Sequence, residues 1–269
     1  MREADPMEPD QTEPDHAEAA QWLARHGLTD AEPTPLLTAR LAVRRRAKAV
    51  DSALLAAFIL GAALMQTLGR LAGGTPSRPT LLVLAALVVA LLMAQWTLGR
   101  WVRRVDRQAG ARLPRRVAHP VQLGWRAVLG RPHAVFAVAT FTAAVLLAVS
   151  VLPIADAALR YGAIFVLIGL FGAGAGVVMQ LRQVLASPAV AEDEASLTAD
   201  VIMRVEDARA LVTPSLVWIL PALFLYGESI GWWNAVSMAL VVAGVIALFL
   251  IHMRSAGVAT AARRAMAIR

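Results

Sequence analysis

The chain has 269 residues, of which 58% are hydrophobic and 17% charged, and it carries a formal net charge of +7 at pH 7. Soluble domains average roughly 45–50% apolar and about 25% charged residues, so this composition excludes an ordinary soluble globule. Because the chain contains no cysteine, disulfides, thiolate metal sites and thiol catalysis are also excluded.

The N-terminal segment, residues 1–34, predicts an acidic cytoplasmic tail with one short helix. Asp15 can cap this helix, Glu18 completes a capping box three residues later, and Gly27 ends it. Such a helix either docks a cytoplasmic partner or rests on the protein or the membrane surface, and we favour the second alternative. Residues 35–51 then place leucines among arginines, which predicts an interfacial basic helix.

Six apolar segments have the length of a membrane-spanning helix. A helix rises 1.5 Å per residue, so about 20 residues cross the roughly 30 Å of hydrocarbon in a bilayer. None of the six contains Asp, Glu, Lys or Arg. Residues 52–154 therefore predict membrane helices 1–3, and residues 155–254 predict membrane helices 4–6. The segments are Ser52–Gly69, Thr80–Gly99, Ala134–Ile154, Tyr161–Gln180, Ala210–Tyr226 and Trp232–Ile251.

The basic residues that flank these segments predict the orientation. On one side they number 21, and on the other side there are three, Arg70, Arg78 and Arg160. The positive-inside rule places both termini, including a basic tail over 255–269, in the cytoplasm. The predicted fold is an all-α polytopic protein of the plasma (inner) membrane, with six transmembrane helices and short cytoplasmic amphipathic helices. Anionic lipid headgroups are the expected partners of the arginines, and nucleic acid is not.

The loop between helices 4 and 5 combines an acidic run with a helical pattern. The run Glu192–Glu194 is typical of a solvated loop. After it, apolar residues at helical spacing predict an amphipathic cytoplasmic helix over 196–211 that continues into helix 5. We expect Val201, Val205 and Ala208 on the apolar face of this helix.

Small residues in two membrane helices predict where helices touch. Gly172 and Gly176 form a GxxxG pair in helix 4, and Ala239 and Ala243 belong to a ridge of alanines at four-residue steps in helix 6. Small residues let two backbones approach closely inside a bilayer. The ridges serve either packing within the chain or a homo-oligomer, and packing within the chain is the default expectation.

No enzyme signature occurs in the sequence, since both the metalloprotease pattern HExxH and the phosphate loop GxxxxGK[ST] are absent. We therefore expect a non-enzymatic protein with no cofactor and no metal site. Two carboxylates at the membrane edges are candidate functional groups. Asp51 opens helix 1, where it either pairs with a nearby arginine or forms a cation site, and Glu228 lies in the outer turn between helices 5 and 6.

Two segments around helices 1 and 2 carry a recognisable pattern. RRRAKAVDSALL has the spacing R-x-x-A-x-x-V-D from Arg44 to Asp51, and QWTLGRWVRRVD contains Thr97, Gly99 and Arg100. Over about 44–154 the chain resembles the RDD family of small bacterial membrane proteins. It lacks that family's second aspartate in helix 2 and the glycine before R-V. The resemblance implies cation/proton exchange, which is associated with some members, and it nominates these five residues for the site.

Three functions fit these features. The first is a non-enzymatic membrane protein that moves, or helps to move, a cation or small solute. The second is the six-helix permease subunit of an ABC-type exporter, which would need a separate ATPase subunit as its partner. The third is a membrane anchor or assembly protein, whose N-terminal tail and helix 196–211 dock a cytoplasmic partner.

Overall fold

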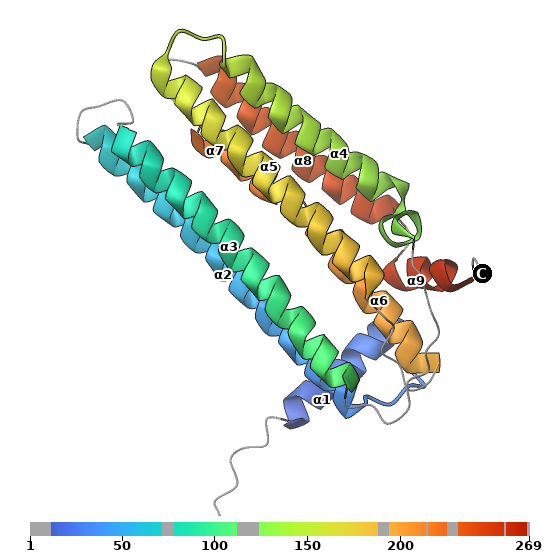
Figure 1. Cartoon of the computed structure of the whole chain (residues 1–269). Coiled ribbons are helices and arrows are strands. Elements are labelled where there is room, and N and C mark those ends of the chain that lie inside the picture. The colour runs from blue at the N-terminus through green and yellow to red at the C-terminus, as the bar shows by residue number, and fades with distance from the viewer. Residues whose placement is uncertain are drawn as a thin grey trace, which may run out of the picture.

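The computed structural model describes residues 12–71, 78–111, 124–187, 194–213, 215–224, 231–255 and 257–267. Within these ranges every regular element is an α-helix, and long helices run side by side with three shorter helices gathered at one end (Figure 1). The helices are α1 (Thr12–Arg25), α2 (Pro35–Leu71), α3 (Arg78–Ala111), α4 (Trp125–Val151), α5 (Ala157–Ala186), α6 (Glu194–Leu211), α7 (Ser215–Phe224), α8 (Gly231–Arg254) and α9 (Val258–Ala267).

Five of the described helices are long and apolar enough to cross a membrane: α2, α3, α4, α5 and α8. Many large apolar side chains on their outer faces are exposed, as expected for helices that face lipid, and examples are Leu60, Val89, Val138, Phe171 and Phe249. The prediction of an all-helical, multi-pass membrane architecture is therefore confirmed. Glu228 and the outer turn around it lie outside the described residues.

The fifth predicted span, over 210–226, is not one long helix. Helix α6 ends at Leu211, and α7 contains only ten residues, which amount to about 15 Å or half of the hydrocarbon thickness. The sequence has proline at position 214, between these helices, and a proline has no backbone N–H to continue a helical ladder. The helix is therefore interrupted between Leu211 and Ser215, although the apolar pattern of the sequence is continuous there.

The predicted interfacial helix over 35–51 is not a separate element either. It forms the first half of α2, which runs unbroken for 37 residues, or about 55 Å. This length exceeds the hydrocarbon thickness by roughly 25 Å, so the basic half of α2 projects beyond it. Two of the four arginines of this half, Arg40 and Arg44, do not face lipid, because they are buried against carboxylates of the protein.

The long helices form two groups. Helices α2 and α3 pair as a hairpin, while α4, α5, α7 and α8 pack on one another beside it (Figure 1). The groups meet where α3 packs on α5, with Val88 beside Gly169 and Leu92 beside Gly172. Since both residue numbers rise together, α3 and α5 run parallel. The core shared by the two groups contains Phe58, Leu84, Leu91, Val166, Leu170 and Leu220.

The cytoplasmic amphipathic helix predicted over 196–211 is a separate helix that is buried on all sides. Its consecutive residues Val201, Ile202 and Met203 are each at most 1% exposed, although they point in different directions around α6. Helices α4, α5 and α9 pack against α6, which explains why its middle turns, residues 199–205, have no solvated face. The residues expected on the apolar face, Val201, Val205 and Ala208, are buried, but the expectation that the opposite, polar face meets solvent was wrong.

The first and last helices lie at the same end of the bundle, with α6 between them (Figure 1). We call this end, which contains α1, α6 and α9, the charged end. Arg263 of α9 donates through Nη2 to the backbone oxygens of His26 and Gly27, at 3.3 and 3.4 Å. Trp22, Leu37, Ile202 and Ala262 also share one hydrophobic cluster there. The charged end is therefore a packed layer of its own.

The small residues nominated for helix packing behave differently from one another. A Cβ atom on Gly172 would meet Leu92 of α3 at 3.3 Å, whereas one on Gly176 would meet nothing within 4 Å. Ala239 and Ala243 are exposed on the outside of α8, so the default expectation that they pack within the chain was wrong. The alternative, that they pack in a homo-oligomer, stays a prediction.

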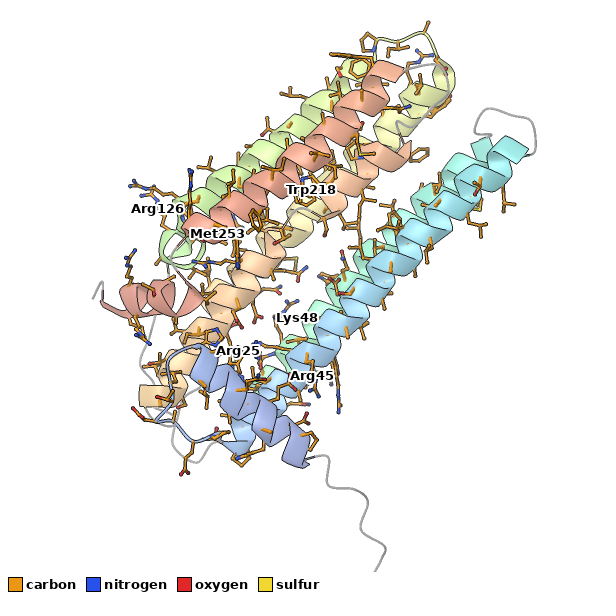
Figure 2. All side chains as sticks on the ribbon, turned by 180° about the vertical axis from the view of Figure 1, so that it is seen from behind. Arg25, Arg45, Lys48, Arg126, Trp218 and Met253 are labelled. Atoms are coloured by element: carbon orange, nitrogen blue, oxygen red, sulfur yellow. The ribbon has the colours of Figure 1, made fainter. Side chains whose placement is uncertain are left out.

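A close helix approach on α8 lies at Gly244, on a different face from the alanine ridge. There the indole of Trp218 on α7 fills the space that a Cβ would need, at 2.6–2.8 Å (Figure 2). Phe136 of α4 packs on the same indole edge-on, with 6.2 Å between ring centroids. A lone glycine beneath a tryptophan therefore marks this contact, and a four-residue ridge does not.

Candidate functional site

Six charged residues meet at the charged end, and we call them the charge cluster: Arg40, Arg44, Asp106, Asp200, Arg204 and Asp207. They come from α2, α3 and α6. On α2 the arginines are four residues apart, and on α6 the three charged residues follow one another at steps of four and three. These spacings place each set on one face of its helix, so the faces can meet.

Asp200 is the centre of the charge cluster. Its side chain is 0% exposed, and it binds Arg40 through Oδ1 at 2.5 Å and Arg204 through Oδ2 at 2.8 Å. Arg204 also donates through Nη1 to the backbone oxygen of Ser187, just after α5, at 2.5 Å. Asp200 therefore joins α2 to α6, and Arg204 extends the connection to α5.

Arg44 makes the second connection of the charge cluster. Its Nη2 lies 2.9 Å from Asp106 Oδ2 on α3 and 3.1 Å from Asp207 Oδ2 on α6. Arg40 reaches the same Asp106 through Nε at 3.0 Å. Three arginines thus face three aspartates, and the cluster is neutral as a whole. A buried charge is tolerated only when it is paired and hydrogen-bonded, which every member achieves.

Helix α1 is held against α2 and α6. Arg45 of α2 forms ion pairs with Asp15, at 2.8 Å, and with Glu18, while His26 Nε2 lies 3.3 Å from Glu206 of α6 (Figure 2). Asp15 lies inside α1, which begins at Thr12, so the predicted capping box at Asp15 and Glu18 was wrong. The buried side chains of Trp22 and Leu23 show that α1 rests on the protein, as we favoured.

Asp51 lies on the same face of α2 as Arg44, two turns further along, but it does not belong to the charge cluster. Gln95 of α3 donates through Nε2 to Asp51 Oδ1 at 3.0 Å. Among the residues that the structure describes, no lysine or arginine forms an ion pair with Asp51. The structure therefore does not support the alternative in which a nearby arginine pairs with Asp51.

The other residues nominated by the RDD resemblance lie in one turn of α3 but have different surroundings. Thr97 is exposed and donates to the backbone oxygen of Ala94, and exposed Arg100 stacks over Trp96 at 4.6 Å. Gly99 faces α5, where a Cβ would meet Gln180 Oε1 at 2.8 Å. The structure thus brings Arg44, Asp51 and Gly99 to helix interfaces and leaves Thr97 and Arg100 on the surface.

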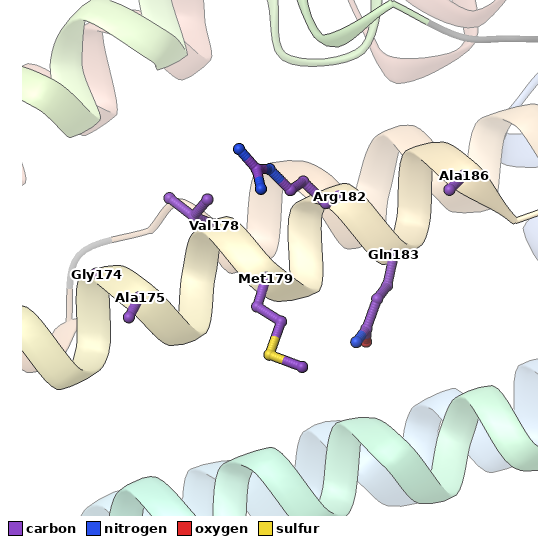
Figure 3. Close-up of a pocket in the computed structure, with 7 residues that line it drawn as sticks. All are labelled: Gly174, Ala175, Val178, Met179, Arg182, Gln183 and Ala186. Atoms are coloured by element: carbon purple, nitrogen blue, oxygen red, sulfur yellow. The ribbon is translucent and has the colours of Figure 1, made fainter.

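A shallow furrow runs along the outer face of α5 towards the charged end, and its volume is about 600 Å³. Gly174, Ala175 and Ala186 form its floor, because their small side chains leave space. Figure 3 shows two rows of longer side chains that diverge from this floor, with Met179 and Gln183 pointing towards α3 and Arg182 pointing the opposite way.

Sequence reasoning missed Asp106, Asp200, Arg204 and Asp207. The sequence pattern could have indicated the last three, because Asp200, Arg204 and Asp207 follow one another at steps of four and three and therefore share one face of a helix. Among the described residues, no group of three or more histidine, aspartate or glutamate side chains could hold a metal ion. No family model, curated protein or solved structure matches the chain, so the RDD resemblance stays a prediction.

Proposed function

We propose that the chain is a non-enzymatic multi-pass protein of the inner membrane that moves a cation or small solute, with Asp51 as the cation-binding group. The observation that carries this proposal is the set of contacts that the Asp51 carboxylate makes. A carboxylate at the edge of an apolar segment is hydrogen-bonded by an amide and has no ion pair among the described residues. Ionisable groups in membrane segments are candidates for ion pathways, because desolvating them is costly.

The charge cluster explains why Arg44, a nearby arginine among the described residues, does not pair with Asp51. Arg44, two turns away on the same face of α2, is engaged by Asp106 and Asp207. The cluster is neutral, so it offers Asp51 no surplus positive charge. A cation that entered between α2 and α3 would supply the charge that Asp51 lacks, and Gln95 would orient the carboxylate.

We further propose that the charged end lies in the cytoplasm and that the chain crosses the membrane six times. Three observations support this topology. Helices α1 and α9 lie at one end of the bundle, the flanking basic residues number 21 on that side against three, and α7 leads away from the charged end towards the start of α8. Trp233 near that start packs with Leu147, Val151 and Leu159, at the opposite end.

Docking of a cytoplasmic partner receives less support. The two helices that were candidates for docking, α1 and α6, both bury their apolar residues inside the chain, including Leu23 and Ile202. A partner would have to bind other surfaces. No contact described above favours an ATPase subunit over any other partner.

Replacing Asp51 by asparagine should reduce cation flux to the level of empty vesicles, because the amide keeps the shape of the side chain and removes its charge. The purified chain would be reconstituted into liposomes, and flux of Na⁺, K⁺ or H⁺ down an imposed gradient would be followed with ion-sensitive dyes. Asp30→Asn is the matched control, since Asp30 is exposed in the turn after α1 and its replacement should leave flux unchanged.

Two results would contradict the proposal. One is undiminished flux in the folded Asp51→Asn protein, and the other is a wild-type protein that moves none of these cations. Arg100→Ala separates the RDD resemblance from the structure. The resemblance predicts loss of flux in this variant, whereas the exposed position of Arg100 over Trp96 predicts little change.

A further inference from the structure

The furrow on α5 has an apolar part and a basic part. Gly174, Ala175, Val178 and Met179 line the part that lies deeper in the bundle, and Arg182 and Gln183 line the part near the charged end. Arg182 follows Ala157, where α5 begins, by 25 residues, or about 38 Å, which exceeds the roughly 30 Å of hydrocarbon. Arg182 therefore lies at the level of lipid headgroups, while Gly174 and Ala175 in the floor of the furrow lie at the level of acyl chains.

The positive charge around the basic part is not compensated by the protein. Arg182 is exposed, and no acidic side chain among the described residues pairs with it. On α3, Arg103 lies one turn beyond Gly99, which faces Gln180 of α5, and Arg103 Nη2 is buried without a hydrogen-bond partner. This contrasts with the charge cluster, where each arginine has a carboxylate.

Gln183 provides an unsatisfied polar group at the other edge of the furrow. Its Oε1 is buried and has no hydrogen-bond partner, which is costly for an amide. Turning this side chain away from α3 and into the furrow would let a hydroxyl donor reach it. The furrow thus combines a guanidinium that can bind a phosphate, an amide that can bind a hydroxyl, and an apolar strip beside them.

We propose that this furrow binds one anionic phospholipid, with its phosphate at Arg182, its headgroup hydroxyl at Gln183 and one acyl chain along Gly174, Ala175, Val178 and Met179. The longer side chains diverge on either side of Gly174 and Ala175, which leaves room between them for an acyl chain (Figure 3). Asp51 does not line the furrow, so the site does not depend on cation movement.

Native mass spectrometry of the full-length protein in detergent tests this site. The probes are phosphatidylglycerol and phosphatidylcholine with identical acyl chains. The wild-type chain should bind one phosphatidylglycerol molecule with at least about tenfold lower Kd than phosphatidylcholine, since only the former has a net negative charge and headgroup hydroxyls. Equal affinity for the two lipids would overturn the proposal.

Two variants locate the lipid, and one serves as control. Arg182→Ala removes the phosphate contact, and Ala175→Phe fills the floor without changing charge; each should raise the Kd for phosphatidylglycerol by about tenfold. Ala175 is exposed, so the larger ring leaves the core intact. Arg126→Ala is the control, because Arg126 is an exposed arginine on α4 outside the furrow (Figure 2). Similar Kd values for all three variants, or a furrow filled by a second copy of the chain and detected as a dimer, would overturn the proposal.

Discussion

Replacing Asp200 by asparagine should lower the free energy of unfolding by about 3–5 kcal/mol, the range found when one partner of a buried ion pair is removed. Asp200 is 0% exposed and accepts hydrogen bonds from both Arg40 and Arg204. Asparagine keeps the shape but leaves two buried guanidinium groups facing a neutral amide. Denaturant titration of the purified protein in detergent, followed by circular dichroism, measures the loss.

Glu18→Gln is the control for this prediction. It removes one carboxylate of the ion pair between α1 and Arg45, whose side chain is 50% exposed, so its effect should stay below about 1 kcal/mol. The combined variant Arg40→Met, Asp200→Leu and Arg204→Met should recover much of the stability, because apolar side chains can replace a buried ion triad. Asp106 still has Arg44 in that variant. Wild-type stability in Asp200→Asn would show that the charge cluster is not buried as described.

Replacing Met203 by alanine should cost about 2–5 kcal/mol, the usual range for truncating a large buried side chain. Met203 is 1% exposed, on the side of α6 opposite Val201, which is also 1% exposed. The amphipathic helix expected from the sequence would place Met203 on its solvated face and predict almost no loss. The same denaturant titration therefore distinguishes a helix buried on all sides from an amphipathic one.

Met253→Ala is the matched control for this substitution. Met253 on α8 is 68% exposed and points away from the bundle, so the same chemical change removes few contacts (Figure 2). We expect its effect to remain within about 0.5 kcal/mol. Equal losses in the two methionine variants would contradict the burial of α6.

The membrane helices were predictable from sequence because their signal is local. About 20 residues without a charge are enough to identify a span, and α2, α3, α4, α5 and α8 each contain one. The break before α7 was harder to predict, because its apolar residues continue on both sides of proline 214. A composition pattern measures how apolar a segment is and does not measure whether its helix is continuous.

The charge cluster was not predictable because it depends on three helices that are distant in sequence. Arg40 and Asp200 are 160 residues apart, and nothing near either residue indicates the other. A cluster of arginines beside an apolar segment is typical of lipid-facing positions, so the sequence predicts that position for the basic residues of α2. Burial of Arg40 and Arg44 against acidic partners from α3 and α6 gives these two residues the role of holding the hairpin in place.

The burial of α6 has a similar explanation. Its sequence contains charged residues at regular steps, which suggests a solvated face when the helix is considered alone. Two of these charges, Asp200 and Arg204, are satisfied inside the protein and need no water. A helix can therefore have a polar side and still be buried on that side, provided its partners come from elsewhere in the chain.

Cysteine labelling tests the proposed topology, in which both termini and the charged end lie in the cytoplasm and the chain crosses the membrane six times. Because the natural chain has no cysteine, single cysteines give unambiguous labelling. Thr29→Cys, Ala155→Cys and Gly257→Cys place one exposed thiol after α1, between α4 and α5, and before α9. A membrane-impermeant maleimide would be applied to spheroplasts, before and after permeabilisation.

With six crossings, we expect Ala155→Cys to be labelled in intact spheroplasts, and Thr29→Cys and Gly257→Cys to be labelled only after permeabilisation. Labelling of Gly257→Cys but not Thr29→Cys in intact spheroplasts would mean an odd number of crossings, and it would contradict the proposed topology.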